Sequence, residues 1–146
     1  MNQQVLEFIQ EKNLAIYGVS RSGNKFGNTI ANELKQRGYQ VSVIHPQADE
    51  INGEKCYHSI QEIKDRVNAV LICLPPTKAA EAIREAAQAG IRKIWLQQGA
   101  NGMETAQAAQ EMQVSPITGK CILMYAEPVT AYHRWHRGFA KLFGAY

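Results

Sequence analysis

Short apolar segments of strand length alternate with segments of helical character along most of this chain. The apolar segments cover residues 14–19, 39–45, 68–74 and 91–96. The third of them reads Asn-Ala-Val-Leu-Ile-Cys-Leu and is apolar over nearly its whole length, which suits a strand covered on both faces. Strands that alternate with helices at this spacing predict βαβ units joined by right-handed crossovers.

The segments between the strands have the capping and periodicity of helices. Helices are expected over about residues 2–12, 28–37 and 102–112, after the capping-box pattern that begins at Ser59, and from Pro75 to Gly90. Residues 114–117 and 121–125 would add a fifth strand and a sixth strand or extended tail. The sequence thus predicts an α/β, Rossmann-type open parallel sheet of about five strands with helices on both faces.

Length and composition set the class of protein. A chain of 146 residues suits a single domain spanning 1–146. No apolar run approaches the roughly 20 residues that cross a bilayer, and the first residues lack a secretory signal, so we expect a cytoplasmic protein without membrane contact. The cysteines Cys56, Cys73 and Cys121 are odd in number and widely spaced, which predicts reduced thiols rather than disulfides or a zinc site.

The turn after the first strand has the composition of an anion site. In open parallel sheets, ligands bind beyond the carboxyl ends of the strands, where a following helix offers free N–H groups. The glycine spacing G-x4-G-x3-G matches neither the dinucleotide fingerprint nor a P-loop, and a connection that binds nothing remains an alternative. The candidate ligands to an anion here are Gly18, Ser20, Arg21, Ser22, Gly23, Lys25 and Gly27.

The end of the second strand narrows the choice of cofactor. An NAD site requires an acidic residue there to bind the ribose hydroxyls, whereas this strand ends in Ile44-His45-Pro46 and the first acid is Asp49. A cofactor that is phosphorylated on its ribose would repel such a carboxylate, which favours coenzyme A or NADP over NAD. The alternative for His45 is a strand-end residue that faces solvent.

Three further motifs occur in an order that carries a resemblance. Leu74-Pro75-Pro76-Thr77 follows the third strand, Ile94-Trp95-Leu96-Gln97-Gln98-Gly99 ends the fourth, and Cys121-Ile122-Leu123-Met124 follows later. Together with the 18–23 turn and His45-Pro46, they resemble the small CoA-binding proteins of bacteria and archaea. That family is similar to the N-terminal domain of the succinyl-CoA synthetase alpha subunit and of NDP-forming acyl-CoA synthetases. The resemblance covers about residues 14–124.

The resemblance implies a ligand and a place for each of its parts. Coenzyme A or an acyl-CoA would bind through its 3′-phospho-ADP moiety, with its phosphates on residues 20–23 and its adenosine beside the loop after His45. The pantetheine arm would run along Pro75, Pro76, Leu96, Gln97 and Gln98. The chain departs from the family at His45, where the small members usually have Asn, and at Gly119-Lys120, where they have Asp-Arg.

The resemblance also bears on catalysis. In the synthetases a phosphohistidine and a nucleotide-grasp domain perform the chemistry, and 146 residues do not hold those domains. No catalytic residue and no metal site is assigned, so a non-catalytic sensor, carrier or regulatory module is expected, although the question of enzyme activity stays open. Cys121 is either a nucleophile near a bound thioester or a buried small hydrophobe.

The C-terminal segment is predicted to form an amphipathic helix over about residues 128–143. Tyr132, Trp135, Phe139 and Phe143 recur near helical spacing, which favours packing on the domain, on a second copy or on a partner protein. His133 and His136 would supply two ligands to a metal ion, which is half of a site, but no neighbouring carboxylate completes it. The few basic residues make nucleic acid an improbable partner. An NADP-binding oxidoreductase or redox sensor, and an interaction module with a vestigial nucleotide site, are the alternative functions.

Overall fold

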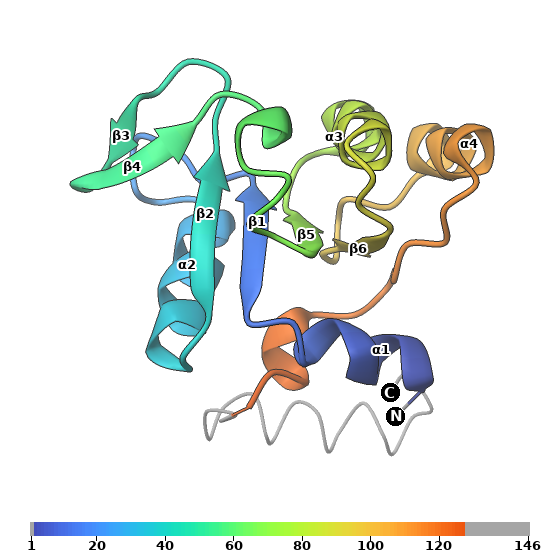
Figure 1. The fold of residues 1–146 in the computed structure, drawn as a ribbon, viewed down its shortest axis with the longest axis horizontal. Helices are drawn as coiled ribbons and strands as arrows, with labels where there is room; N and C mark the ends of the chain where they lie inside the picture. The colour runs from blue at the N-terminus through green and yellow to red at the C-terminus, as the bar shows by residue number, and fades with distance from the viewer. Residues whose placement is uncertain (1, 128–146) are drawn as a thin grey trace.

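A six-stranded sheet with helices on both faces forms the body of the molecule (Figure 1). The computed structural model describes residues 2–127. The strands are β1 (Asn13–Tyr17), β2 (Gln40–Ile44), β3 (Glu50–Ile51), β4 (Glu54–Tyr57), β5 (Ala69–Ile72) and β6 (Lys93–Leu96). The helices are α1 (Gln3–Ile9), α2 (Phe26–Gln36), α3 (Pro76–Gln88) and α4 (Met103–Met112), with short 3-10 turns η1 (Ile60–Glu62) and η2 (Ile122–Met124).

The order of the strands places a switch point at the centre of the sheet. The order is β3-β4-β2-β1-β5-β6, and every pair except β3 with β4 is parallel. The chain leaves β1 toward β2 on one side and later returns to β5 on the other. The loops after β1 and β5 therefore diverge above the same edge, where parallel α/β sheets bind their ligands.

Alternating residues of the strands divide the core into two layers. In β1, Leu14 and Ile16 pack with α1, α2 and η2, while Ala15 and Tyr17 pack with α3, α4 and η1. Trp95 of β6 lies fully buried in the first layer, with its ring 5.2 Å from that of Phe8 and 5.8 Å from that of Tyr125. Burial of the central strands on both faces confirms the predicted α/β fold with helices on both faces.

Three expected elements are shorter than predicted. The capping box of Ser59 and Glu62 forms, but the helix after it is only the single turn η1, because β5 begins a few residues later. The expected strand at 114–117 is a single bridge between Ile117 and Trp95, and Pro116 has no N–H with which to extend it. Within residues 121–125, where a sixth strand or an extended tail was expected, Ile122–Met124 form the 3-10 turn η2.

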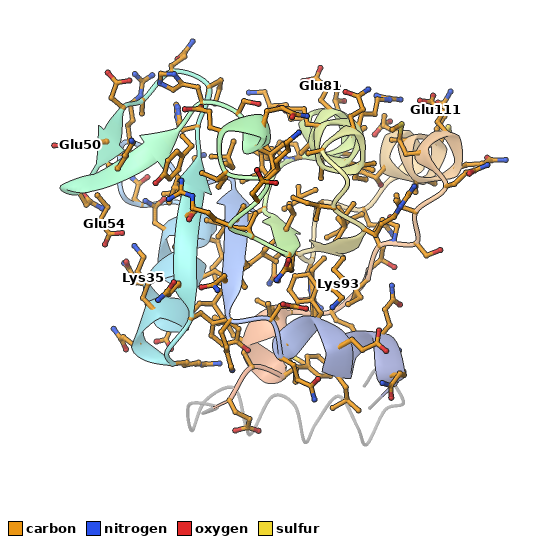
Figure 2. The ribbon with its side chains drawn as sticks, viewed as in Figure 1. Lys35, Glu50, Glu54, Glu81, Lys93 and Glu111 are labelled. Atoms are coloured by element: carbon orange, nitrogen blue, oxygen red, sulfur yellow. The ribbon has the colours of Figure 1, made fainter. Side chains whose placement is uncertain are left out.

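The β3–β4 hairpin was not predicted from the sequence. Asn52 and Gly53 turn it with φ values of 53° and 79°, a conformation typical of the tight turns that join antiparallel strands. Its second strand continues the sheet beside β2, where Glu54 pairs with Lys35 of α2 (Figure 2). The hairpin thus extends the sheet by two strands beyond β2.

Two glycines allow three parts of the switch point to approach closely. A Cβ atom on Gly18 would lie 2.2 Å from the carbonyl oxygen of Cys73, and one on Gly27 would lie 2.3 Å from the carbonyl oxygen of Gly18. Neither contact can be relieved by a side-chain movement, because the atoms that would be met belong to the backbone. The end of β1, the end of β5 and the first turn of α2 are therefore in contact without intervening side chains.

Replacing Gly27 by alanine should destabilise the fold even though alanine favours helix. We expect Gly27→Ala to lower the free energy of unfolding by at least about 2 kcal/mol, because the methyl group overpacks a backbone contact. Gly90→Ala is the matched control: its φ of +87° strains alanine by about 1 kcal/mol, but nothing lies within 4 Å. Urea unfolding that finds Gly27→Ala the milder substitution would contradict the close packing.

Candidate functional site

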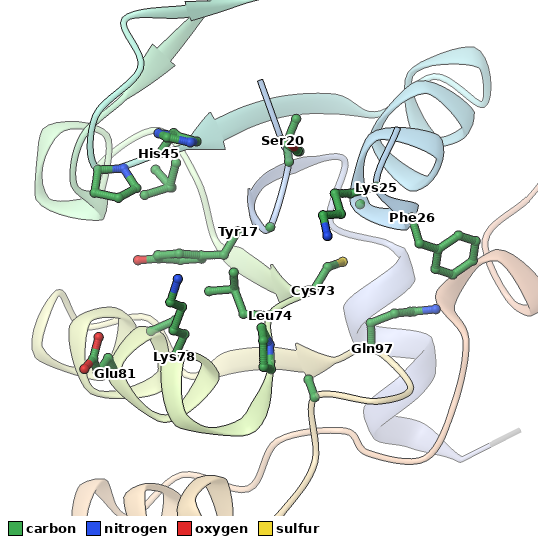
Figure 3. A pocket seen from close by; sticks show the side chains of 18 of the residues that line it. Tyr17, Ser20, Lys25, Phe26, His45, Cys73, Leu74, Lys78, Glu81 and Gln97 are labelled. Carbon is green, nitrogen blue, oxygen red and sulfur yellow. The ribbon is translucent and has the colours of Figure 1, made fainter. Parts of the chain in front are cut away.

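A pocket of about 900 Å³ opens at the carboxyl edge of the sheet, over the switch point (Figure 3). Its volume lies within the range of sites for drug-sized ligands and cofactors. The walls come from the loops after β1, β2, β4, β5 and β6, from the first turn of α2 and from α3 as far as Glu85. The pocket crosses the edge of the sheet, with Tyr17 on the α3 side and Cys73 on the α2 side.

Most of the residues singled out in the sequence meet in this pocket. Those that line it are Gly18, Ser20, Arg21, Lys25, Gly27, His45, Pro46, Pro75, Pro76, Gln97 and Gln98. Ser22 and Gly23 lie in the same loop but outside the pocket wall, and Leu96 is buried in the core on the α3 side. The wall that Leu96 was expected to form is instead formed by residues that follow it, including Gln98 and Ala100.

Two helix N-termini meet at the pocket without a side-chain cap. Lys25 is the N-cap of α2 and Pro75 is the N-cap of α3, and neither side chain accepts a hydrogen bond from its helix. The first N–H groups of a helix have no acceptor within the helix, and the helix dipole makes this end electropositive. Arg21, Lys25 and Lys78 add positive side chains to the same wall. The arrangement is suited to anions of phosphate type.

Asn28 fixes the first loop and was missed by the sequence analysis. Its Oδ1 accepts a hydrogen bond from the Ser20 N–H at 2.9 Å, and its Nδ2 donates to the Ser20 carbonyl at 2.9 Å. A buried asparagine on the inner face of a helix is the signal that could have found it. Because Asn28 already uses the Ser20 N–H, an anion would bind the hydroxyl of Ser20 and the first turn of α2.

His45 organises the loop after β2. Its Nδ1 accepts hydrogen bonds from the backbone N–H groups of Gln47 (3.1 Å) and Ala48 (2.9 Å). An asparagine oxygen makes the same pair of bonds in an Asx turn, which explains how histidine replaces the Asn of the resembling family. Burial, Arg21 and His58 lower the pKa of His45, so the ring is neutral at pH 7 and its Nε2–H is left to donate.

The α3 end of the pocket holds an unpartnered hydroxyl beside carboxylates. The Tyr17 hydroxyl is buried and makes no hydrogen bond, and burial, with Glu85 nearby, raises the pKa of Tyr17. Burial and the neighbouring Glu81 raise the pKa of Glu85 above that of an ordinary carboxyl. Lys78 extends over the same region (Figure 3). This end offers both a hydroxyl donor and carboxylate acceptors to a ligand.

The α2 end is lined by Cys73, Phe26 and Gln97. Burial, with a contribution from Cys121, raises the pKa of Cys73 to about 12, so this thiol is protonated at neutral pH and is a weak nucleophile. Cys73 was expected in the core, and the structure shows that it also borders the pocket. Cys121 is buried and is absent from the pocket wall, which favours the small-hydrophobe alternative.

Several other expectations concern features outside this pocket. Within residues 2–127 no three His, Cys, Asp or Glu side chains gather as metal ligands, and no described helix is long and apolar enough to cross a membrane. The three cysteines form no disulfide. The predicted helix at 128–143, with His133 and His136, lies outside the described residues.

The turn made by His45 should be tested by two substitutions and by pH. His45→Ala removes the acceptor of two N–H groups and should lower the free energy of unfolding by about 1 kcal/mol, whereas His45→Asn should stay within about 0.5 kcal/mol of the parent.

The pH dependence follows from the sign of the pKa shift. Folding lowers the pKa of His45, so its contribution to stability is complete above about pH 6.5 and is lost as the pH falls through the folded-state pKa. Urea titrations between pH 7.5 and 5 should show a steeper loss for the parent than for His45→Asn. Equal slopes, or an Asn variant as unstable as the Ala variant, would refute this role.

Relatives of known activity are large enzymes that the chain matches only in part. It is 39% identical over 83 residues to the ADP-forming acetate–CoA ligase II of Archaeoglobus fulgidus, a match over 56% of this chain and 12% of the ligase. The ADP-forming acetate–CoA ligase of Methanocaldococcus jannaschii is 31% identical over 81 residues, again over 56% of this chain and 12% of the relative. The match therefore spans about an eighth of the length of each of these two relatives.

Solved structures share the fold and confirm the resemblance. A conserved hypothetical protein from Pyrococcus furiosus superposes with a TM-score of 0.70 and 33% identity, over 76% of this chain and 96% of that one. The dinucleotide-forming acetyl-coenzyme A synthetase 1 of Ca. Korarchaeum cryptofilum, in complex with phosphate and ADP, gives a TM-score of 0.64 and 25% identity over 81% of this chain and 27% of that one. The family model described as a CoA binding domain matches residues 12–127, and the chain belongs to that family.

Proposed function

We propose that this protein binds coenzyme A or an acyl-CoA through the 3′-phospho-ADP moiety at the switch-point pocket. The observation that carries the proposal is the meeting of two uncapped helix N-termini, α2 and α3, with Arg21 and Lys25 at one pocket wall. Membership of the CoA-binding family supports this choice of ligand, and no comparison supports NADP.

The layout of the pocket suggests where each part of the ligand lies. The diphosphate would contact the Ser20 hydroxyl and the first turn of α2, with Arg21 and His45 Nε2 near the ribose phosphate. The adenine would occupy the α3 end, where Tyr17 donates to a ring nitrogen and Glu85 accepts from the exocyclic amine. The pantetheine arm would pass Pro75 and Pro76, whose rings offer an apolar wall, toward Gln97 and Gln98.

We further propose that the chain acts as a sensor, carrier or regulatory module and performs no chemistry on the ligand. The protonated Cys73 thiol supports this role, since it is the nucleophilic side chain that borders the pocket at its α2 end. A single domain over 1–146, a cytoplasmic location and contact with a second copy or a partner through residues 128–143 stay predictions.

A ligand panel tests the proposed function directly. Coenzyme A at 100 times its dissociation constant should stabilise the protein by about 2.7 kcal/mol in a thermal-shift assay, while NAD and NADP at the same concentration should not. Dephospho-CoA should bind more weakly than CoA, because the charge on the 3′-phosphate is lost. Stabilisation by NADP without stabilisation by CoA would overturn the proposal.

Substitutions test where the diphosphate binds. Ser20→Asp should abolish CoA binding by repulsion, whereas Ser115→Asp, remote from this pocket, should not. Gly27→Asp would be a poor test, because any side chain at that position collides with the backbone of Gly18. Calorimetry that finds CoA affinity unchanged in Ser20→Asp would move the phosphates elsewhere.

Tyr17 provides a test in which stability and binding change in opposite directions. Tyr17→Phe removes a buried hydroxyl that has no partner, so the unliganded protein should be as stable as the parent or more stable by up to about 1 kcal/mol. CoA affinity should fall about fivefold, because the ligand loses a hydrogen bond.

Tyr39→Phe is the matched control. The Tyr39 hydroxyl donates to the Ile9 carbonyl at 2.6 Å and lies away from the pocket, so this substitution should cost about 1 kcal/mol of stability and leave CoA affinity unchanged. Equal CoA affinity in Tyr17→Phe and the parent, measured by calorimetry, would exclude Tyr17 from the ligand site.

A further inference from the structure

The Gln97 side chain has one half of its amide bonded and the other half free. Its Oε1 accepts a hydrogen bond from the Ile122 backbone N–H at 3.1 Å, while Nε2 is buried and has no acceptor. A flipped amide would set two donors against each other at Ile122, so the hydrogen-bond network fixes the orientation. Gln97 is 2% exposed, and it lines the pocket.

Gln97 lies at the opposite end of the pocket from Tyr17. Figure 3 shows it on the same side as Phe26 and Cys73, with its nitrogen toward the Phe26 side. Phe26 lines this end of the pocket and is 55% exposed, so little packing opposes a movement of its side chain away from the amide. The side chains that flank the amide at this end include Phe26 and Cys73.

A buried donor without an acceptor costs free energy that a bound acceptor would recover. Phe26 offers no acceptor, and the Cys73 sulfur is only a weak one. In the proposed ligand the charged groups lie at the Ser20 hydroxyl and the first turn of α2, so the acceptor that reaches Gln97 from the pantetheine arm is a neutral one. A neutral carbonyl oxygen meets both conditions, and an arm that passes Pro75 and Pro76 brings its terminal group to this end.

We propose that Gln97 donates from Nε2 to the carbonyl oxygen of an acyl thioester, so that the protein prefers a short-chain acyl-CoA to free coenzyme A. This inference rests on the proposed function. It adds a residue that distinguishes acylated from free coenzyme. It also predicts that the α2 end of the pocket contains the acyl group rather than a bare thiol.

Two ligands that differ only in this carbonyl test the inference. Acetyl-CoA and S-ethyl-CoA have terminal groups of similar size, but the thioether lacks the oxygen. In the parent protein, calorimetry should find acetyl-CoA about fivefold tighter than S-ethyl-CoA. In Gln97→Met the two affinities should become equal, mainly through weaker binding of acetyl-CoA.

A second variant separates binding from folding. Gln97→Leu removes the donor with a side chain of similar volume and should abolish the preference as Gln97→Met does, so that one stably folded variant of the two is sufficient. Gln107→Met, on the exposed face of α4 and outside the pocket, is the control and should keep the fivefold preference.

Each of the remaining outcomes would overturn either this inference or the proposed function. Equal affinities of the parent for the two ligands would overturn the inference. So would a Gln97→Met variant that weakens CoA, acetyl-CoA and S-ethyl-CoA by the same factor, because the amide would then bind a carbonyl of the pantetheine arm. Failure of every CoA derivative to bind the parent would instead overturn the proposed function.

Discussion

The contact between backbone segments at the switch point is the constraint on which the rest of the site depends. Gly18 lies against the Cys73 carbonyl and Gly27 lies against the Gly18 carbonyl, so the ends of β1 and β5 and the first turn of α2 meet without side chains between them. This approach brings the first turn of α2 to the edge of the sheet, where its N–H groups face the pocket. A larger residue at either position would push the helix away and weaken the candidate anion site along with the fold.

Hydrogen bonds of Asn28 and His45 hold two of the loops to the core and leave the surface that faces the pocket open. Asn28 holds Ser20 by both of its backbone groups, and His45 holds the loop after β2 by two N–H groups. The N-termini of α2 and α3 receive no side-chain cap, although such caps are common and contribute about 1 kcal/mol to stability. The loops are thus fixed where they meet the core, while the groups that favour an anion stay available. A preorganised site of this kind loses little entropy on binding.

The sequence predicted the architecture well and the finer geometry less well. The alternation of apolar strands with helices was sufficient to predict the fold, because burial of the strands on both faces determines a parallel sheet that is covered by helices. The hairpin at Asn52-Gly53 was missed although Asn-Gly is a known turn signal, since its strands are too short for their periodicity to be recognised. The capping box at Ser59 predicted a helix start correctly but not its length, which the position of β5 limits. The sequence places Asn28 on the inner face of its helix but does not identify Ser20 as its partner. Tyr17 could not be assigned at all, because only the packing shows which polar groups are buried and whether they have partners.

The unpartnered polar atoms favour a ligand that spans the pocket over one that fills a single end. The Tyr17 hydroxyl and the Gln97 amide lie in the two different core layers, on opposite sides of the sheet edge, and both border the same pocket. A ligand that satisfied only one of them would leave the cost of the other in place. A molecule with a base at one end, phosphates above the α2 N-terminus and a carbonyl at the other end satisfies all three regions at once. Burying these two atoms without partners lowers the stability of the unliganded fold, and binding recovers part of that free energy. Ligand affinity is therefore coupled to the stability of both layers.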